Sequence, residues 1–557
     1  MVSSNTKNAG LYFLPLGGAG EIGMNMNLLG YGPAARPKWL MIDCGVTFGD
    51  DTTPGIDLIM PDPAFIAERR KDLLGLVLTH AHEDHIGAVP HLWPRLECPV
   101  YCTPFTAALL LEKLKEVKLA GKVPIHVVPL GGSIELGPYR IEFISITHSI
   151  PEPNVLAVHT PLGTVVHTGD WKIDPEPLVG QVTDEKALRA LGEKGVRAMI
   201  CDSTNVFVPG SAGSEAGVRD RLATLIADLP RRVAVTAFAS NVARLDSIAR
   251  AALRHDRHVV LVGRSMNRIV EAAQACGYLK NLPRFLDAED GGWLPPEKVL
   301  YLCTGSQGEA RAALARIAQG THPHVTLSGG DTVIFSSRVI PGNERAISAV
   351  QNQLMARGID IITATEEEDV HVSGHPCRDD LAHMYQWIRP EVAVPVHGEL
   401  RHLMEHRDFA QTMQTPETVL APNGTLVRLA PGPAEILEEV ESGRLYLDGT
   451  ILQSDESEAL RERRRMAFAG LATVTLVVDV RGRLAVPARV ALHGVPDAED
   501  MTEALIEIAG EVVHREEGRA WADEAFVSEM ARRAVRKAIS QRTGTKPQVK
   551  VDIIRLG

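Results

Sequence analysis

Long hydrophobic runs are missing from this 557-residue sequence. No uninterrupted apolar stretch approaches the roughly eighteen residues that a membrane-spanning helix needs. The first residues, Met1 to Lys7, also lack the apolar segment of a secretory signal. We therefore expect a protein that neither crosses a membrane nor is exported, although 45 % of its residues are hydrophobic.

Cysteine is scarce and scattered. The seven cysteines are an odd number and form no C-x-x-C pair. Most lie beside strand-like apolar runs, where a buried thiol is the ordinary interpretation. This usage fits a reducing compartment, and we expect a cytoplasmic protein.

Positive charge is in deficit as well. Lysine and arginine number 58 against 70 aspartates and glutamates, which gives a net charge of −12. Such a balance argues mildly against a nucleic-acid partner. It excludes neither RNA nor DNA, because phosphate contacts need only a local basic groove. Any basic surface is therefore expected to be confined to a small part of the protein.

The length of the chain is enough for about three domains with full cores. The first two hundred residues alternate short apolar strands with turns, which is a strand-rich α/β layout. From about residue 209, helical patterns (one of them over 309–318) alternate with apolar strands, which predicts a parallel sheet with helical cover. A compact α+β unit, with a strand over 484–492, ends the chain. The predicted boundaries are 1–208 for the first domain, 209–380 for an inserted α/β domain, 381–446 for the return to the first domain, 447–465 for a polar linker and 466–557 for the C-terminal α+β domain.

A glycine-rich segment follows the first predicted strand. Gly18-x-Gly20-x-x-Gly23 matches a dinucleotide-binding fingerprint by letter. The residues after it form no amphipathic helix whose N-terminus could hold a pyrophosphate. We interpret the segment as a turn between strands, where glycine lets the backbone pass close to a neighbouring pocket.

The most informative motif is His80-Ala81-His82-Glu83-Asp84-His85, which follows the apolar run Leu74 to Thr79. A turn after a buried strand places alternate side chains on one side of the sheet edge. The two imidazoles of His80 and His82 can then bind one cation, while Asp84 and His85 reach a second. The alternative is a histidine-rich surface loop. The H-x-H-x-D-H pattern resembles the signature of the metallo-β-lactamase fold, whose members are mostly binuclear hydrolases.

Further candidate ligands stand at the ends of other apolar strands. His148 follows Ile144 to Thr147, and Asp170 follows Val165 to Gly169. Taken alone, each would more often be a turn residue. By resemblance, His80, His82 and His148 would bind one cation, Asp84, His85 and His397 the other, and Asp170 would bridge them. Asp43 resembles the aspartate that orients a ligand imidazole in this fold. Imidazole and carboxylate ligands suit Zn²⁺ or Mn²⁺, with Mg²⁺ also open.

Motifs further along resemble the β-CASP nucleases, and most specifically the bacterial ribonuclease J family. They include Asp202-Ser203-Thr204-Asn205, Phe238-Ala239-Ser240-Asn241, Gly263-Arg264-Ser265-Met266, Cys303 to Glu309, His371 to His375 and Pro395 to Glu399. His397 stands where histidine is typical of RNA-acting members. The resemblance covers essentially the whole chain. It implies an α/β fold: a metallo-β-lactamase αββα sandwich, an inserted β-CASP domain and a small C-terminal α+β domain.

The resemblance also implies an activity. It predicts a metal-dependent ribonuclease, with 5′→3′ exonuclease and endonuclease activity on single-stranded RNA, acting in RNA decay and maturation. Asp84 would hold or deprotonate the attacking water, and His375 would stabilise the phosphate or protonate the leaving oxygen. The residues expected to bind RNA or a terminal phosphate are Ser240, Asn241, Arg264, His371, Ser373, Gly374 and His375.

Partners and rival functions follow from the same comparison. The family's C-terminal domain supports self-association, so we expect a homodimer or homotetramer, and other RNA-decay proteins are plausible partners. A small-molecule hydrolase, such as a lactonase or thioesterase, would not need the inserted domain. A non-catalytic scaffold would not need seven intact ligands. The sequence leaves open the metal, the balance of exo- and endonuclease activity, and the target transcripts.

Overall fold

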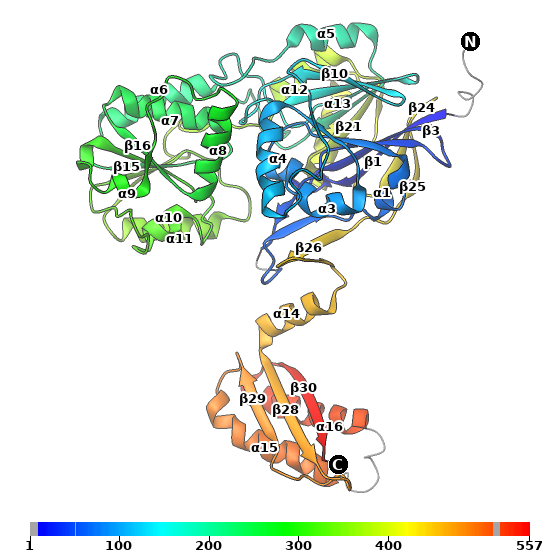
Figure 1. Cartoon of the computed structure of the whole chain (residues 1–557), viewed down its shortest axis with the longest axis vertical. Helices are drawn as coiled ribbons and strands as arrows, with labels where there is room; N and C mark the ends of the chain where they lie inside the picture. Colours follow the sequence, from blue (N-terminus) through cyan, green and yellow to red (C-terminus); the bar gives the residue numbers. More distant parts are fainter. Residues whose placement is uncertain (1–8, 51, 516–523, 557) are drawn as a thin grey trace. The chain divides into compact units, whose positions relative to one another are not determined.

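The computed structural model describes residues 9–50, 52–515 and 524–556 (Figure 1). It divides into two compact units. The division assigns Met1–Thr47 and Met60–Gly443 to the first unit, and Phe48–Ile59 and Arg444–Gly557 to the second. Among the described residues, no helix is both long and apolar enough to cross a membrane. The finer domain boundaries given above stay predictions.

The first unit contains two sheets packed face to face. The eight strands of one sheet run in the order β25 (Glu435–Glu439), β24 (Thr425–Ala430), β1 (Ala9–Gly17), β3 (Met26–Pro33), β4 (Lys38–Ile42), β7 (Leu73–Val77), β8 (Val100–Cys102) and β9 (Ile125–Val127). The seven strands of the other are β10 (Ser133–Leu136), β11 (Tyr139–Ser145), β12 (Asn154–Thr160), β13 (Gly163–His167), β14 (Ala198–Asp202), β21 (Val392–Val396) and β23 (Glu417–Thr418). One hydrophobic core joins them: Leu11, Phe13 and Leu29 of the first sheet lie with Phe143 and Leu156 of the second.

Helices cover the outer faces of this pair of sheets. Leu188 of α5 (Glu185–Lys194), Leu381 of α12 (Arg378–Ile388) and Phe409 of α13 (Leu400–Thr412) pack with Ile144 and Met199 against the second sheet. Helices α1 (Ala64–Ala67), α3 (Val89–Leu96) and α4 (Pro104–Glu116) lie beside the first sheet (Figure 1). The predicted αββα sandwich is therefore confirmed.

An α/β domain is inserted between β14 and β21. Its six strands are all parallel, in the order β17 (Leu286–Asp287), β16 (His258–Val262), β18 (Val299–Cys303), β15 (Val233–Thr236), β19 (Thr332–Phe335) and β20 (Asp360–Thr363). Figure 1 shows α6 (Glu215–Ala227) and α7 (Val242–Arg254) on one side of this sheet. Helices α10 (Ala313–Ala318) and α11 (Glu344–Met355) lie on the other side, and α8 (Arg264–Ala275) and α9 (Ala288–Gly291) complete the cover. The predicted parallel sheet with helical cover is confirmed.

The insertion does not interrupt the sheet that it leaves. Strands β14 and β21 pair in parallel, and Asp202 lies opposite Val396 in their register. The carboxyl ends of parallel strands meet at one sheet edge, so Asp202 and His397 emerge side by side despite the long separation in sequence. In the other sheet, β4 pairs with β7 in parallel, with Ile42 opposite Val77. This register brings Asp43 beside the start of the histidine motif.

The second unit is an α+β fold. Strand β28 (Leu471–Val478) pairs antiparallel with β29 (Arg489–His493) and parallel with β30 (Gln548–Arg555). Helices α15 (Ala498–Arg515) and α16 (Glu524–Thr543) pack on this sheet through buried residues such as Leu505 and Val535. The predicted C-terminal α+β fold is confirmed.

Three local predictions differ from the structure. Residues 447–465, expected as a linker, contain the end of β26 (Arg444–Asp448), the whole of β27 (Ile451–Ser454) and the first two thirds of α14 (Glu458–Ala469). The strand predicted over 484–492 is shortened to β29, which begins after Pro487, a residue without a backbone N–H to donate. The helix predicted over 309–318 begins only at Ala313.

Candidate metal centre

The histidine motif lies in a tight loop held by its neighbours. It leaves β7 and enters the short helix α2 (Glu83–Ile86). Backbone N–H groups of Asn25 and Cys44 donate to the carbonyls of Asp84 and His85 at 2.9 and 2.7 Å. Gly45 has to be glycine, because a Cβ there would lie 1.7 Å from the Asp84 carbonyl oxygen. The loop is therefore fixed by the backbone on both sides.

A first cluster of ligand-type side chains consists of His80, His82, His148 and Asp170, whose nitrogen and oxygen atoms lie within 4.8 Å of one another. His82 Nδ1 lies 3.1 Å from His80 Nε2 and 3.0 Å from His148 Nε2. The far nitrogen of His148, Nδ1, donates to the Gly374 carbonyl at 2.5 Å. Three imidazole nitrogens thus face one point.

Burial determines the protonation of these three histidines. It lowers the pKa of His80 and His148 well below the ordinary histidine value, and that of His82 to about 4. Neighbouring imidazoles add to the shift of His80 and His148. Near neutral pH the three rings are uncharged and offer lone pairs, which is the form in which histidine binds a cation.

A second cluster consists of Asp84, His85, Asp170 and His397. His85 Nε2 lies 3.1 Å from Asp170 Oδ2, and His397 Nε2 lies 3.1 Å from Asp84 Oδ2. Burial alone would lower the pKa of both histidines. The carboxylates around them, Asp170 foremost, outweigh burial and raise both pKa values well above the ordinary one. Asp170 belongs to both clusters, as the bridging role requires.

Hydrogen bonds from the far side orient the ligand rings. His85 Nδ1 donates to Asp43 Oδ2 at 2.7 Å, and the same oxygen accepts from Thr79 Oγ1 at 2.9 Å. Because the Thr79 hydroxyl donates to Asp43, its oxygen is left to accept from His80 Nδ1, 3.0 Å away. Asp43 therefore orients two rings, one directly and one through Thr79, and leaves both Nε2 atoms facing inward.

A matching arrangement holds His397, which has a left-handed backbone (φ 53°). Thr204 Oγ1 donates to Asp202 Oδ1 at 2.7 Å and lies 2.7 Å from His397 Nδ1. The other Asp202 oxygen accepts from His375 Nδ1 at 2.8 Å. The sequence marked Asp202 and Thr204 only as parts of a family motif, and their separation from His375 and His397 gave no sign of these contacts.

The two clusters fit divalent cations on their chemistry. Four of the five imidazoles have Nδ1 tied to a protein group and Nε2 facing inward, and His82 faces inward through Nδ1. Nitrogen atoms face one another at 3.0–3.1 Å, an arrangement that a shared cation explains. Imidazole and carboxylate donors without thiolate suit Zn²⁺ or Mn²⁺.

Four family models match successive parts of the chain. They are the metallo-beta-lactamase superfamily (residues 37–222), the beta-CASP domain of ribonuclease J (230–354), the Zn-dependent metallo-hydrolase RNA specificity domain (363–422) and the ribonuclease J C-terminal domain (458–556). Ribonuclease J of Sinorhizobium meliloti is 46 % identical over 98 % of this chain and 97 % of its own length. The chain belongs to the ribonuclease J family.

Other ribonuclease J proteins are similar over the same length. That of Mycolicibacterium smegmatis is 38 % identical over 98 % of both chains, and that of Corynebacterium glutamicum is 37 % identical over 98 % of this chain and 76 % of its own. A solved structure from Enterococcus faecalis, titled as a protein of unknown function, shares the fold over 75 % of this chain and all of its own, with TM-score 0.52 and 17 % identity. Ribonuclease J membership confirms the predicted metallo-β-lactamase and β-CASP nuclease domains.

The ribonuclease J motif from 371 to 375 lies against the first cluster. A Cβ on Gly374 would lie 2.8 Å from His148 Cε1, so only glycine allows this close approach. Ser373 Oγ accepts from the backbone N–H of His375 at 3.1 Å and from Asn205 Nδ2 at 2.8 Å. The loop thus brings Ser373, Gly374 and His375 to the clusters of ligand-type side chains.

The remaining residues expected to bind phosphate are connected to the 371–375 loop only through other residues, or not at all. Asn241 caps α7, because its Oδ1 accepts from the backbone N–H of Arg244 at 2.9 Å. The buried guanidinium of Arg244 then reaches His371 Nδ1 at 3.2 Å, which ties this cap to the 371–375 loop. Ser240 precedes the cap. Arg264 begins α8 and is exposed, and no contact among the described residues links it to the others.

Proposed function

We propose that this ribonuclease J family member is a binuclear metal-dependent ribonuclease that hydrolyses single-stranded RNA, as a 5′→3′ exonuclease with endonuclease activity. The observation that carries the proposal is the sharing of Asp170 by the two ligand clusters and by a third group, in which Asp202, His375 and His397 lie with it. His375 belongs to the loop between β20 and α12, in the last part of the insertion, so the inserted segment and the two-sheet sandwich meet at the clusters. A role in RNA decay and maturation in the cytoplasm would follow.

Two divalent cations, Zn²⁺ or Mn²⁺ with Mg²⁺ as a further candidate, would be held by the proposed ligands His80, His82, Asp84, His85, His148, Asp170 and His397. When bound, they would supply the positive charge that activates water and offsets the charge of the phosphate in the transition state. Asp43 would keep the rings of His85 and His80 in place.

Two side chains would handle the protons. Burial raises the pKa of the Asp84 carboxyl, but His85 and His397 outweigh it and hold the pKa below its usual value. Asp84 is thus a carboxylate able to accept a proton from the attacking water. Burial lowers the pKa of His375, but Asp202 and Asp170 together outweigh burial and raise this pKa above the ordinary histidine value, which favours the protonated ring. His375 would donate to the scissile phosphate or to the leaving O3′, giving a 5′-phosphate product.

The preference for a 5′-monophosphate end would come from groups around the 371–375 loop. Ser240, Asn241, Ser373 and Gly374 offer hydroxyl, amide and backbone N–H donors, which bind phosphate oxygens. His371 is joined to this group through Arg244. Arg264 would have to reach RNA from the start of α8.

The test uses metal-stripped full-length protein and single-stranded RNA with a labelled 5′-monophosphate. Mn²⁺, Zn²⁺ or Mg²⁺ is then added back. Release of the label as a mononucleotide, only with metal, is the expected result. Asp84→Asn should abolish it, while the matched control Glu83→Gln, an exposed carboxylate next in the chain, should not. Internal fragments alone would leave only the endonuclease, and intact RNA with every metal would refute the proposal in favour of a small-molecule hydrolase or a scaffold.

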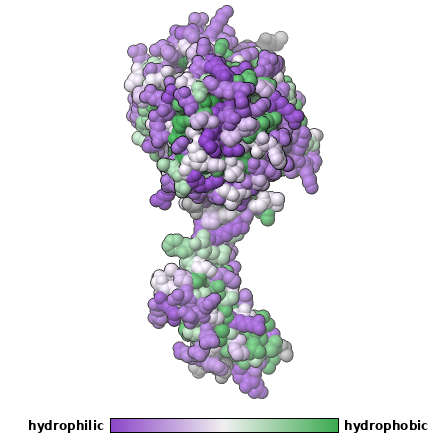
Figure 2. Space-filling view, turned by 90° about the vertical axis from the view of Figure 1, so that its left-hand side faces the viewer, coloured by the Kyte–Doolittle hydropathy of each residue, from purple (hydrophilic) through white to green (hydrophobic). Residues whose placement is uncertain are grey.

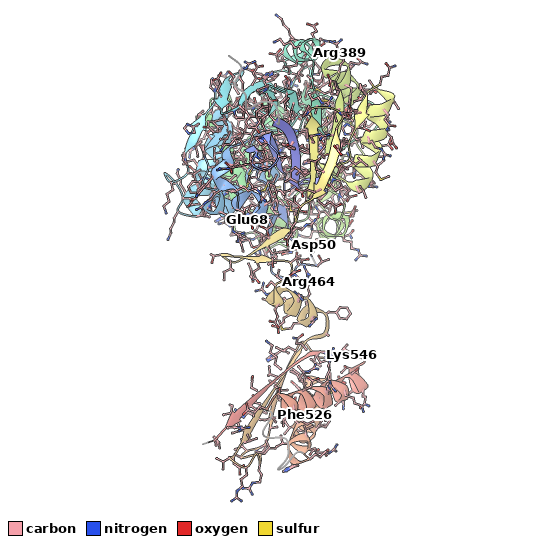
Figure 3. All side chains as sticks on the ribbon, turned by 90° about the vertical axis from the view of Figure 1, so that its right-hand side faces the viewer. Asp50, Glu68, Arg389, Arg464, Phe526 and Lys546 are labelled. Atoms are coloured by element: carbon pink, nitrogen blue, oxygen red, sulfur yellow. The ribbon has the colours of Figure 1, made fainter. Side chains whose placement is uncertain are left out.

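Self-association is proposed for the second unit. Figure 2 shows hydrophobic side chains on its surface. The exposed hydrophobic residues of this unit include Phe468, Val480 and Phe526, the last of which is labelled in Figure 3. Exposed apolar patches of this kind mark interfaces. We expect a homodimer or homotetramer by light scattering, and the substitutions Phe468→Ser and Val480→Ser should shift it toward monomer. An unchanged oligomer would refute this assignment. Other RNA-decay proteins remain further candidate partners.

A further inference from the structure

Arg338 is an exposed cation close to the 371–375 loop, which carries His375. It lies in the segment that follows β19. Its Nη1 donates to Asn205 Oδ1 at 2.8 Å. Among the residues that the structure describes, it forms no ion pair with a carboxylate. A guanidinium has five N–H donors, so most of its hydrogen-bonding capacity is left for a ligand.

Asn205 connects Arg338 to the proposed catalytic histidine. Its Nδ2 donates to Ser373 Oγ at 2.8 Å and to the His375 carbonyl at 3.1 Å. The orientation of this amide is fixed, because the carbonyl can only accept and the guanidinium can only donate. Asn205 is buried, so Arg338 is held two hydrogen bonds away from the loop that carries His375.

The backbone around Arg338 is held by one other side chain. Gln307 Nε2 donates to the Arg338 carbonyl at 2.8 Å, and Gln307 Oε1 accepts from the Ile340 N–H at 2.9 Å. Gln307 is 5 % exposed and belongs to the motif from Cys303 to Glu309, for which the proposed function gives no role. Two motifs therefore converge on Arg338: Gln307 holds its backbone and Asn205 holds its side chain.

The surroundings of Arg338 suit a nucleotide. Its charge acts on the predicted phosphate-pocket residue His371, since burial first, then Arg244 and Arg338, lower the His371 pKa. Val339 and Ile340, beside it in the chain, are 39 % and 46 % exposed. A guanidinium next to apolar side chains offers one group for a phosphate and others for the face of a base. Because the chain has a net charge of −12, it needs local positive charge, such as that of Arg338, where it binds RNA.

We propose that Arg338 binds a phosphate group of the RNA next to the bond that is cleaved, with Gln307 and Asn205 holding it in position for that contact. The inference rests on the proposed ribonuclease function and adds a residue that determines how the substrate is held. The phosphate is either the 5′-terminal one or an internal one. The two phosphates would bind Arg338 in the same way. Comparing RNA that has a 5′-phosphate with RNA that lacks one distinguishes them.

The test compares Arg338→Met and Arg338→Lys with the native full chain, and with Arg284→Met as a matched control. Arg284 is an exposed arginine of the same inserted domain, just before β17, which lies near the opposite edge of the sheet from β19. Binding of uncleavable phosphorothioate RNA is measured at several salt concentrations. We expect Arg338→Met to weaken binding about tenfold or more and to reduce the slope of log affinity against log salt by about 0.7, the value for one lost contact with a single strand. Arg338→Lys should keep the slope, and Arg284→Met should change neither quantity.

Steady-state kinetics distinguish two roles of Arg338: contact with the RNA, and positioning of His375 through Asn205. A lost phosphate contact raises KM and leaves kcat within a few-fold of native. An equal loss with 5′-hydroxyl and 5′-phosphate RNA would assign an internal phosphate, and a loss confined to 5′-phosphate RNA would assign the terminal one. Unchanged affinity and slope, or a fall in kcat at unchanged KM, would overturn the inference. Salt-dependent RNA binding by native protein without cleavage would refute the ribonuclease function alone, and the binding comparison would still decide the role of Arg338.

Discussion

The two ligand clusters share Asp170 and use the same kinds of side chain, yet they differ in charge. In the cluster of His80, His82 and His148, burial keeps the imidazoles neutral. In the cluster of His85 and His397, carboxylates overcome burial and raise the histidine pKa values. The first cluster is therefore ready to bind a cation, and the second has to release protons as its cation binds. Environment, more than residue type, sets the behaviour of each cluster.

The largest effect is expected from Asp170→Asn, which removes the carboxylate that both clusters share. Metal content should fall from two per chain toward zero, and RNA cleavage by on the order of 10³-fold or more, because the positive charge at the phosphate is lost. Elemental analysis of the purified variant, together with the cleavage rate, checks this. Two tightly held metals and a native rate would show that Asp170 bridges nothing.

His148→Ala and His397→Ala should separate the clusters. Each variant should retain one cation per chain instead of two and lose most of its activity. The proton release that accompanies metal binding should shrink only in His397→Ala, because only that histidine belongs to the cluster with raised pKa values. Calorimetry in buffers of different ionisation enthalpy measures the protons released. Equal proton release in the two variants would contradict the electrostatic difference.

His375→Gln tests a residue outside both clusters. Metal content should stay unchanged, and kcat should fall by about 10²–10⁴-fold, the usual range for a lost general acid. Asp202 raises the His375 pKa, so the proton-donating form is present below that pKa and is lost as pH rises through it. Native kcat should therefore decline on the alkaline side, and this decline should be absent from the variant. An identical alkaline decline in both proteins would assign it to another group.

A smaller effect is expected from Asp43→Asn, which changes no ligand. The variant weakens the hold on His85 and, through Thr79, on His80. Loss of such a partner costs about 10–100-fold in metal affinity or activity. Competition with a coloured chelator measures the affinity. Native affinity in the variant would show that the rings are positioned without Asp43.

Ser373→Ala should have the smallest effect. Removal of one neutral hydroxyl from the proposed phosphate pocket should reduce the preference for 5′-monophosphate over 5′-hydroxyl RNA by a few-fold to about tenfold, with metal content unchanged. The ratio of kcat/KM for the two substrates is the measurement. The same ratio in variant and native protein would remove Ser373 from the pocket.

Local patterns allowed much of this molecule to be predicted. The histidine motif stands directly after a buried strand, so the gathering of its side chains at one sheet edge could be predicted from spacing. Asp202 and His375, in contrast, are 173 residues apart, and Asn205 and Arg338 are 133 apart. Such pairs depend on how the inserted domain returns to the sheet, which no local pattern encodes. The prediction of a polar linker over 447–465 rested on charge and did not foresee β27 or α14, because charged side chains also cover the exposed face of a helix such as α14.

The most direct test of the account is a stepwise metal titration of stripped protein, with cleavage of 5′-monophosphorylated RNA followed in the same samples. The account predicts that the first equivalent of Mn²⁺ binds with little proton release and supports little cleavage. The second equivalent should release protons and bring mononucleotide production to its full rate. Full activity after one equivalent, or none after two, would contradict a binuclear centre built on Asp170.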